Sequence, residues 1–503
     1  MIQESGLEPM PPLMPTAQAL TGRLTTPLSG ARVRLNGALW MVRLGRGCLM
    51  AFAAMALIST NREAGLLTLG ALAQINSPVR GGVQVGIAFL LLPVGAALWL
   101  AGRWLLLGPR PWAARWRLGP LPVVVPLGSL LVLTLVHLSP AIGWADGAFV
   151  LTGLGLLVMA YLFILWDGPR GPALAAFVAL VGGLQALVGV GQFVLQHDLG
   201  LRWLGEMSLN PSAAGVSVLG GSVRILRAYG LMRHPNALGA ILPLSLLAAL
   251  SLWLRAGRRQ RAIWSALILV ITAGLALSFS RAGWIAALAG VGVLFMASRS
   301  TRDRARHMGG GSWLPVVLGA AVVVVGMVSL EPGLFLGRVL GALGGGSGLE
   351  HGSMAERLFS LQTAWTLIER WPLWGVGTRQ YVLVVAQLIH VSPRESLLVD
   401  STPLALWAEL GLAAPVAWLG LGLALVWLGC RRAAARAANL DLALATAWMA
   451  AVEVVCLFQA FFWPSHELWQ GAIWLGIVLG LWARAWPGGL ARPAAAAPAG
   501  DLD

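Results

Sequence analysis

The sequence predicts an all-α, polytopic membrane protein with about 12 transmembrane helices and with both termini in the cytoplasm. Composition is the first observation: of 503 residues, 58% are hydrophobic and 11% are charged, and the mean hydropathy is +0.77. A soluble domain carries about 25% charged residues, and a soluble chain of this length could not bury so much apolar surface. The second observation is that apolar stretches long enough to cross a bilayer recur along the chain, with arginines clustered between them.

The spans follow one another with mostly short connections. Residues 1–38 are rich in Pro, Thr and Gly and lack the short apolar core of a signal peptide, so they are expected to form a cytoplasmic tail. Residues 39–486 form the expected membrane domain, and the Pro/Ala-rich residues 487–503 are expected to form a disordered cytoplasmic tail. The expected spans lie at about 44–60, 83–102, 119–138, 147–166, 173–195, 236–255, 262–279, 283–297, 314–330, 402–430, 441–463 and 468–486.

Orientation follows from the arginines of the short loops. If the spans alternate, the arginine-rich short loops share one side, and the positive-inside rule places that side in the cytoplasm. These arginines are Arg103, Arg110, Arg115, Arg117, Arg255, Arg258, Arg259, Arg261, Arg299, Arg302, Arg304, Arg306, Arg431, Arg432 and Arg436. Two long connections, at about 196–235 and 331–401, are then expected in the periplasm.

The net charge of +15 therefore indicates loop sorting, and no nucleic-acid partner is expected. The cysteines are three in number and scattered through apolar stretches, so they indicate neither a disulfide framework nor a metal site. They are Cys48, Cys430 and Cys456.

Arginines also occur in the expected periplasmic segments, where the positive-inside rule does not place them. Long translocated loops escape that rule in part, which is one explanation. The other is that these arginines bind an anion, because a guanidinium offers paired donors to phosphate and keeps its charge. They are Arg202, Arg224, Arg227, Arg233, Arg281, Arg338, Arg357, Arg370, Arg379 and Arg394.

Two motifs in the first half of this region contain such arginines. The first runs from Arg227 to Asn236 and includes Arg233 and His234. Its Pro-Asn step is typical of the start of a helix. The free N–H groups there could bind an anion, or the helix start could simply be capped, with the arginine side chains extending toward the membrane surface. The second motif, Ser-Phe-Ser-Arg-Ala-Gly-Trp, places Arg281 in a hairpin between two spans, where a charge needs water or a partner.

Two further motifs follow in the second half. The third combines Arg357 with Trp-Pro-Leu-Trp-Gly-Val-Gly at 371–377, and the fourth runs from Asp400 to an Ala-Glu-Leu-Gly sequence. Asp400 and Ser401 are suited to cap the tenth span. Glu409 lies more than two turns inside that expected span, where a carboxylate needs a partner.

In order and spacing, the four motifs resemble those of bacterial O-antigen ligases and Wzy-type O-antigen polymerases, over roughly residues 185–415. The resemblance implies a multi-pass enzyme of the bacterial inner membrane that needs no metal or other cofactor. It would transfer a glycan from an undecaprenyl-diphosphate donor to a hydroxyl of lipid A core, a growing glycan or a protein.

The resemblance also implies roles for individual residues. Arg227, Arg281 and Arg357 would hold the diphosphate, and the last two would act at the reacting centre. Substrate contacts are expected at Arg227, Arg233, His234, Asn236 and Glu409. The family has a histidine where this chain has Asp400, so Asp400 is the expected catalytic base. His351 and His390, in the same loop, are the alternatives.

Two other functional classes also account for the outer arginines. A secondary transporter or flippase for an anionic lipid-linked sugar would place ionisable residues within several spans and would have broken helices. The ionisable residues within the expected spans are chiefly Glu409 and Glu453, which are few for a transporter. A non-catalytic partner in envelope assembly is the second alternative, because the family histidine is replaced.

Overall fold

A computed structural model describes the helical body of the chain, which divides into two compact units. The first unit comprises Met1–Ala51 with Leu90–Trp116, and the second comprises Phe52–Phe89 with Arg117–Asp503. The described residues are 25–58, 71–77, 81–107, 118–138, 143–213, 216–219, 224–298, 321, 325, 329, 333, 348–390, 399–435, 439–460 and 468–486.

In the first unit, the long helix α2 (Thr25–Ile58) packs against α3 (Leu91–Leu107). The two backbones approach closely at glycines, since a Cβ on Gly45 would lie 2.9 Å from the Trp99 Cα. Small residues permit such close packing of membrane helices. Trp99 is fully buried as a result.

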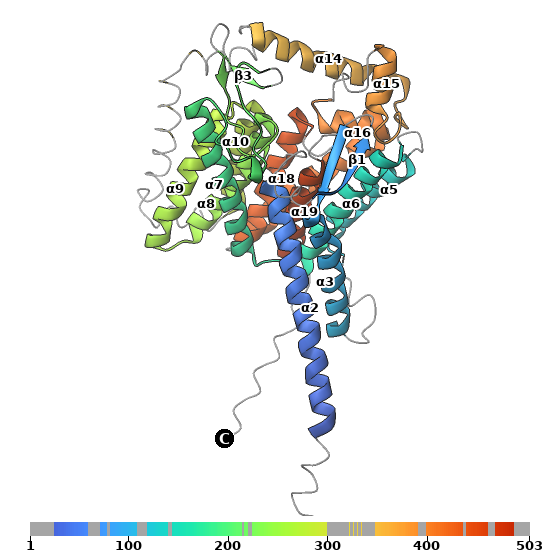
Figure 1. The fold of residues 1–503 in the computed structure, drawn as a ribbon, viewed down its shortest axis with the longest axis vertical. Helices are drawn as coiled ribbons and strands as arrows, with labels where there is room; N and C mark the ends of the chain where they lie inside the picture. The colour runs from blue at the N-terminus through green and yellow to red at the C-terminus, as the bar shows by residue number, and fades with distance from the viewer. Residues whose placement is uncertain are drawn as a thin grey trace, which may run out of the picture. The chain divides into compact units, whose positions relative to one another are not determined.

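The second unit contains the remaining helices (Figure 1). They are α5 (Leu121–Val136), α6 (Gly143–Trp166), α7 (Gly171–Leu195), α8 (Pro235–Arg255), α9 (Arg258–Leu277), α10 (Arg281–Ala297), α14 (Gly348–Arg370), α15 (Tyr381–Leu388), α16 (Thr402–Leu410), α17 (Ala413–Ala435), α18 (Leu440–Phe458) and α19 (Leu468–Ala485). Two antiparallel hairpins join them, β1 (Ala71–Ser77) with β2 (Gly81–Gly86) and β3 (Val218–Leu219) with β4 (Ile225–Leu226). Short 3₁₀ turns, η1 (Ile87–Leu90) and η3 (Arg202–Leu204), complete it.

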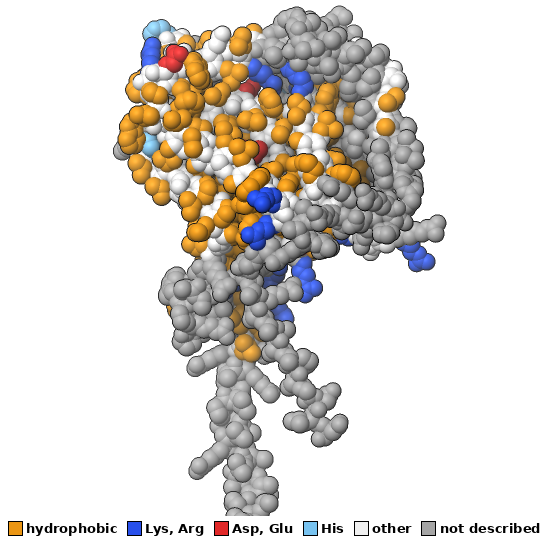
Figure 2. Space-filling view, turned by 180° about the vertical axis from the view of Figure 1, so that it is seen from behind, with side chains coloured by type: hydrophobic (Ala, Val, Ile, Leu, Met, Phe, Trp, Pro, Cys, Tyr) orange, Lys and Arg blue, Asp and Glu red, His pale blue; other side chains and the backbone are white. Residues whose placement is uncertain are grey.

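The prediction of a helical, polytopic membrane protein is confirmed for the described residues. Eight of their helices are long and apolar enough to cross a membrane, and α5 and α10 are shorter apolar helices. Among the described residues of the face seen in Figure 2, hydrophobic side chains predominate, as expected for a surface in contact with lipid. The expected span at 314–330 lies outside the continuously described residues.

Helix α8 lies at the centre of this unit, where it contacts α7, α9, α10 and α18. It is the most deeply buried of the candidate spans found among the described residues. Because α8 begins directly after the first motif, its burial fixes the position of that motif relative to the neighbouring helices.

The expected single span at 402–430 is wrong, because the chain breaks between α16 and α17. Gly411 ends α16 with a φ of +77°, a value that favours glycine. A distant segment forms hydrogen bonds with this break: Val376 N–H donates to Ala408 O (2.8 Å), and Leu412 N–H donates to Pro372 O (3.1 Å). Helix α16 is therefore a short helix that contacts residues 372–376 rather than part of a long span.

The two expected periplasmic connections also contain regular structure. The first holds η3 and the β3–β4 hairpin, and the second holds α14 and α15. In Figure 1, α14 runs crosswise to the bundle helices, along the end at which α8 and α10 begin. The arginines of the second connection are thus partly carried on a helix.

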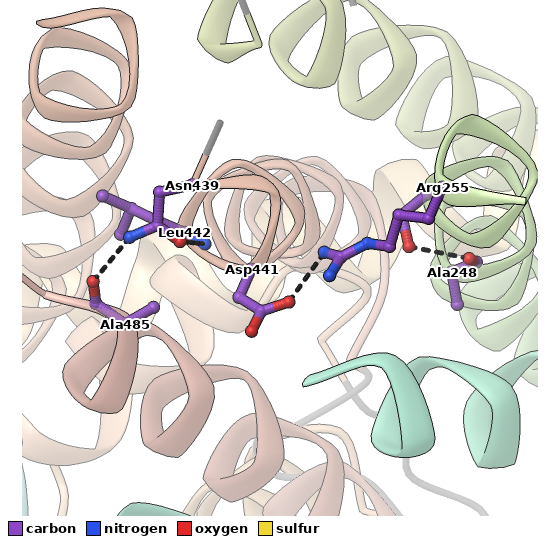
Figure 3. A network of polar contacts seen from close by, with 7 residues as sticks. Ala248, Arg255, Asn439, Asp441, Leu442 and Ala485 are labelled. Carbon is purple, nitrogen blue, oxygen red and sulfur yellow. Dashed lines mark hydrogen bonds and ion pairs between the residues drawn. The ribbon is translucent and has the colours of Figure 1, made fainter. Parts of the chain in front are cut away.

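The opposite end of the bundle is joined by polar contacts between helix ends (Figure 3). Arg255, in the last turn of α8, forms a 2.7 Å ion pair with Asp441 in the first turn of α18. Asn439 caps α18 and donates from its amide nitrogen to Ala485 O at the end of α19 (2.9 Å). These contacts bring together the end of α8, the start of α18 and the end of α19, which are helix ends expected on the cytoplasmic side.

The orientation itself is a testable prediction. A reporter fused after Gly348 is expected to report the periplasm, and one fused after Arg436 is expected to report the cytoplasm, because short arginine-rich loops are retained inside. Paired alkaline phosphatase and green fluorescent protein fusions measure this. The same location for both fusion points would contradict the predicted topology.

Candidate functional site

The first motif is a loop held against α7 by glutamine side chains. Gln192 Oε1 accepts from Tyr229 N–H (3.1 Å) and Gly230 N–H (2.8 Å), and its Nε2 donates to Gly230 O (2.8 Å). Gln185 Oε1 accepts from Leu231 N–H (2.7 Å). Gly230 has a φ of +63°, so the turn favours glycine at this position. Sequence reasoning missed these glutamines, although polar residues in an apolar span were a usable signal.

Arg227 connects the first motif to the second. The side chain is only 3% exposed. Its Nε and Nη2 donate to Ser278 O (2.9 and 2.6 Å), while Nη1 donates to Ser217 Oγ and Nη2 to Asn236 Oδ1 (2.9 Å each). The structure therefore gives Arg227 and Asn236 a role in holding the site together. Their contact with substrate stays a prediction.

His234 and Arg233 lie where this loop enters α8. His234 is the N-cap residue, and its Nδ1 accepts from the Asn236 N–H at 3.1 Å, so the ring proton lies on Nε2 in the neutral form. Arg233 is half-buried. Tyr229, whose ring lies 6.4 Å from the His234 ring, accepts from Ser217 N–H (2.5 Å). Burial raises the pKa of Tyr229, against the lowering effects of that hydrogen bond and of Arg227.

The second motif forms the tight turn between α9 and α10. Phe279 has a φ of +49°, a left-handed conformation that is uncommon for a bulky residue. Ser280 then caps α10, its Oγ accepting from Gly283 N–H at 3.3 Å. Arg281 is the first residue of that helix and is half-buried. Trp284 donates from Nε1 to Leu275 O (3.0 Å) and closes the turn.

Close packing of α8 against α10 fixes this turn next to the first motif. A Cβ on Gly283 would lie 3.0 Å from the Gly239 carbonyl carbon and 3.1 Å from its Cα, so the helices cross with almost no space between them. We expect Gly283→Leu to lower the free energy of unfolding by about 1–3 kcal/mol or more through overpacking.

Thermal unfolding of the purified protein in detergent measures this effect. Gly292→Leu is the matched control, because it makes the same change on the same helix at a glycine whose added Cβ would lie more than 4 Å from the neighbouring helices that the structure describes. Equal unfolding temperatures for the two variants would contradict the close crossing.

The third and fourth motifs meet in an ion pair. Arg357 Nε lies 3.2 Å from Asp400 Oδ2, and both side chains are partly exposed, at 25% and 41%. The structure thus brings together two of the residues that the sequence predicted as catalytic. Arg357 is carried by α14, whereas Asp400 directly precedes the first residues of α16.

Hydrogen bonds join the start of α16, next to this ion pair in the chain, to the second motif. Thr402 Oγ1 donates to Gln459 O (3.1 Å), and Gln459 Nε2 donates to Ser280 Oγ (3.1 Å). Thr402 lies two residues after Asp400, and Ser280 directly precedes Arg281. All four motifs therefore lie at one end of the helical bundle, linked from Arg227 through Ser278 to Asp400.

The expected capping of α16 by Asp400 and Ser401 is confirmed only for the position of Ser401 and is wrong for the side chains. Ser401 is the N-cap residue, but its side chain makes no capping hydrogen bond, and Asp400 lies one residue earlier, in the ion pair. Burial raises the pKa of Asp400, and the negative charge of Glu356 adds to this effect, while Arg357 lowers it. A carboxylate with a raised pKa beside a cation is suited to accept a proton.

The remaining part of the third motif packs onto α16 some distance along the chain from Asp400. Glu409 is fully buried, and its Oε2 accepts from the backbone N–H of Arg379 (2.9 Å), while its backbone O accepts from Gly377 N–H (2.8 Å). Gly375 has a φ of +65°, and a Cβ there would lie 2.5 Å from the Glu409 carbonyl carbon. Glu409 thus holds the 371–377 loop, and its contact with substrate stays a prediction.

Arg379 is the buried cation beside Glu409. Burial lowers the pKa of Arg379 to about 10, against the opposing effect of the Glu409 charge, so it stays protonated at neutral pH. From the sequence, Arg379 was expected in the second periplasmic connection, and no role was predicted for it. Its guanidinium carbon lies 6.0 Å from the Phe149 ring centre, within cation–π range.

The remaining residues that the sequence predicted lie away from the four motifs or outside the described residues. His390 is exposed, with a φ of +53°, just after α15. Arg338, Arg394 and the side chain of His351 lie outside the described residues. Within the described part of the chain, no three His, Cys, Asp or Glu residues are placed to hold a metal ion.

Residues 266–419 match the model of the O-antigen ligase family. The chain carries an O-antigen ligase domain. The family resemblance drawn from the motifs is thereby confirmed, and the protein is a multi-pass membrane enzyme that transfers glycans. The comparison with curated proteins found no match to the chain.

The matched segment contains Arg281, Arg357, Asp400 and Glu409, which are four of the eight catalytic and substrate-contact residues that the sequence predicted. Arg227 and the rest of the first motif precede the ligase domain, and Gln459 follows it. The hydrogen bonds of Arg227 with Ser278 and of Gln459 with Ser280 attach these outside residues to the ligase domain.

Proposed function

We propose that this chain transfers a glycan from an undecaprenyl-diphosphate donor to an acceptor hydroxyl at the periplasmic face of the inner membrane, as an O-antigen ligase or polymerase does. The ion pair of Arg357 with Asp400 is the observation that carries the proposal. In this ion pair a carboxylate lies beside a cation, at the bundle end where the four motifs meet and within the O-antigen ligase domain, which supports Asp400 as the base.

In the proposed reaction, Asp400 accepts the proton of the acceptor hydroxyl as the hydroxyl oxygen attacks the anomeric carbon. The bond between that carbon and the diphosphate oxygen breaks, and its electron pair leaves with the lipid diphosphate. Arg281 and Arg357 stabilise the charge that develops on the diphosphate. A single displacement of this kind inverts the anomeric configuration, and no step requires a metal ion.

Arg357 has two tasks in this scheme. Its Nε bonds to Asp400 Oδ2, which orients the carboxylate and favours its charged form. A guanidinium has five donors, so its Nη groups can bind the departing diphosphate while Nε bonds to Asp400. The base and the leaving group would thus share one cation, which couples proton removal to the departure of the diphosphate.

Reconstitution tests the proposal. The purified protein in liposomes would receive an undecaprenyl-diphosphate glycan with one of three acceptors: lipid A core, a non-reducing glycan end, or a hydroxyl-bearing peptide. We expect a new glycosidic bond on one acceptor, with inverted anomeric configuration, in the presence of EDTA. Movement of the lipid-linked glycan across the membrane without bond formation would instead support a flippase. No transfer to any of the three acceptors would refute the proposal.

The pH dependence of transfer follows from the environment of Asp400. The base must be deprotonated, so transfer is expected to rise with pH through the Asp400 pKa, which burial and Glu356 raise above its ordinary value. Glu356→Gln removes one of the raising charges and should therefore shift the acid limb of kcat/KM to lower pH. Glu369→Gln, also on α14 and exposed, is the control. An unshifted limb in Glu356→Gln would contradict Asp400 as the titrating base.

A further inference from the structure

Gln459 lies between two parts of the candidate site and belongs to none of the four motifs. It directly follows α18 as its C-cap residue and is only 8% exposed. It also follows the end of the segment that matches the O-antigen ligase family. The sequence placed it inside the expected span at 441–463, where it was not singled out.

Its two hydrogen bonds reach the starts of two other helices. The side-chain Nε2 donates to Ser280 Oγ (3.1 Å), and the backbone O accepts from Thr402 Oγ1 (3.1 Å). Ser280 Oγ also accepts from Gly283 N–H and so caps α10, the helix that begins with Arg281. Thr402 is the first residue of α16 and lies two residues after Asp400.

We propose that Gln459 is a positioning residue for glycan transfer, a proposal that rests on the function proposed above. It fixes the start of α10 relative to the start of α16, and therefore Arg281 relative to Asp400. Arg281 binds the departing diphosphate, and Asp400 accepts the proton of the attacking hydroxyl on the other side of the anomeric carbon. A small displacement of one residue relative to the other therefore reduces the rate of transfer. The amide is suited to this task, because it is buried and a hydrogen bond is stronger in a low-dielectric environment.

A role confined to general stability is the alternative, and the chain offers a matched control for it. Gln470, on α19, is also buried, at 6% exposed, and its Nε2 donates to Ala56 O at 2.6 Å. Gln459→Met and Gln470→Met each remove one buried amide hydrogen bond and keep a similar side-chain volume. Only the first breaks a contact with the motif residues.

The experiment compares both variants with the wild-type protein in liposomes, with rates normalised to folded protein. The readouts are kcat/KM for the donor, KM for the acceptor, and the Kd of undecaprenyl diphosphate without a glycan. We expect Gln459→Met to lower kcat/KM for the donor about fivefold and to weaken the binding of undecaprenyl diphosphate about fivefold, because one hydrogen bond is lost. The KM for the acceptor is expected to be unchanged. Gln470→Met is expected to leave all three constants unchanged.

A double-mutant cycle tests whether the effect passes through Ser280. In a Ser280→Ala background, Gln459→Met is expected to cause no further loss, because its hydrogen-bond acceptor is already absent. Equal losses in Gln459→Met and Gln470→Met, or additive losses in the cycle, would overturn the positioning role.

The diphosphate-binding readout separates this proposal from the proposed function. If the wild-type protein binds undecaprenyl diphosphate but transfers no glycan, the proposed function fails while the binding comparison still tests Gln459. If the wild-type protein does not bind undecaprenyl diphosphate, the positioning role is overturned as well.

Discussion

Replacing Asp400 by Asn is expected to lower kcat/KM for glycan transfer by about 10²–10⁴-fold, the usual contribution of a general base. Asparagine has nearly the same shape, and its amide oxygen can still accept from Arg357 Nε, so the contact between α14 and the start of α16 is kept. The variant cannot accept the proton of the acceptor hydroxyl. Asp400→His is expected to recover part of the activity, since the resemblance drawn from the motifs implies a histidine at this position.

Glu356→Gln is the control for this change. It neutralises an exposed carboxylate in the same neighbourhood, but Glu356 is not the proposed base, so transfer at neutral pH is expected to be close to wild type. Rates are measured in liposomes after the folded fraction of each variant is determined. Wild-type transfer by Asp400→Asn would remove Asp400 from the mechanism, and His390 and His351 would then be tested.

Replacing Arg281 by Lys is expected to reduce transfer by about 10²–10³-fold, comparable to removing one preorganised donor from a charge-stabilising site. Lysine keeps the charge but cannot make the paired, planar contact with two diphosphate oxygens. Arg281 is half-buried at the start of α10, and the cap of that helix is Ser280 rather than Arg281 itself. Folding is therefore expected to be preserved. Arg357→Lys is expected to lose activity similarly.

Arg370→Lys is the matched control for both arginines. Arg370 lies in the last turn of α14, is exposed, and belongs to no motif. Transfer by this variant is expected to be unchanged in the same liposome assay. Equal tolerance of Lys at positions 281, 357 and 370 would refute the diphosphate-binding role of these arginines.

The sequence predicted that Arg357 and Asp400 belong to one site, and it predicted one long span that the structure divides into two helices. Arg357 and Asp400 are separated by two helical segments, yet their identification rested on motif order, and the structure pairs them at 3.2 Å. The break between α16 and α17 was missed, because averaging hydropathy over a span-length window hides one glycine. The break at Gly411 is accompanied by hydrogen bonds from distant residues: Val376 N–H donates to Ala408 O, and Pro372 O accepts from Leu412 N–H.

The polar residues that hold the site were missed for a related reason. Gln185, Gln192 and Gln459 each lie in or at the end of an apolar stretch, where a single amide hardly changes the hydropathy. Their partners are backbone groups of the first motif and the Ser280 hydroxyl, which are remote in sequence. No local pattern identifies a contact whose two halves lie in different helices.

Composition, apolar periodicity and motif order were sufficient to determine that this chain is a polytopic membrane protein with an O-antigen ligase domain, because these properties are local and additive along the chain. Tertiary structure alone decided which polar residues act on one another. In the folded chain, Arg227 is buried and donates to Ser278 O, Glu409 accepts from the Arg379 backbone N–H, and Asp400 pairs with Arg357. Burial and pairing depend on which helices pack together, and that packing determines the environment of each charge.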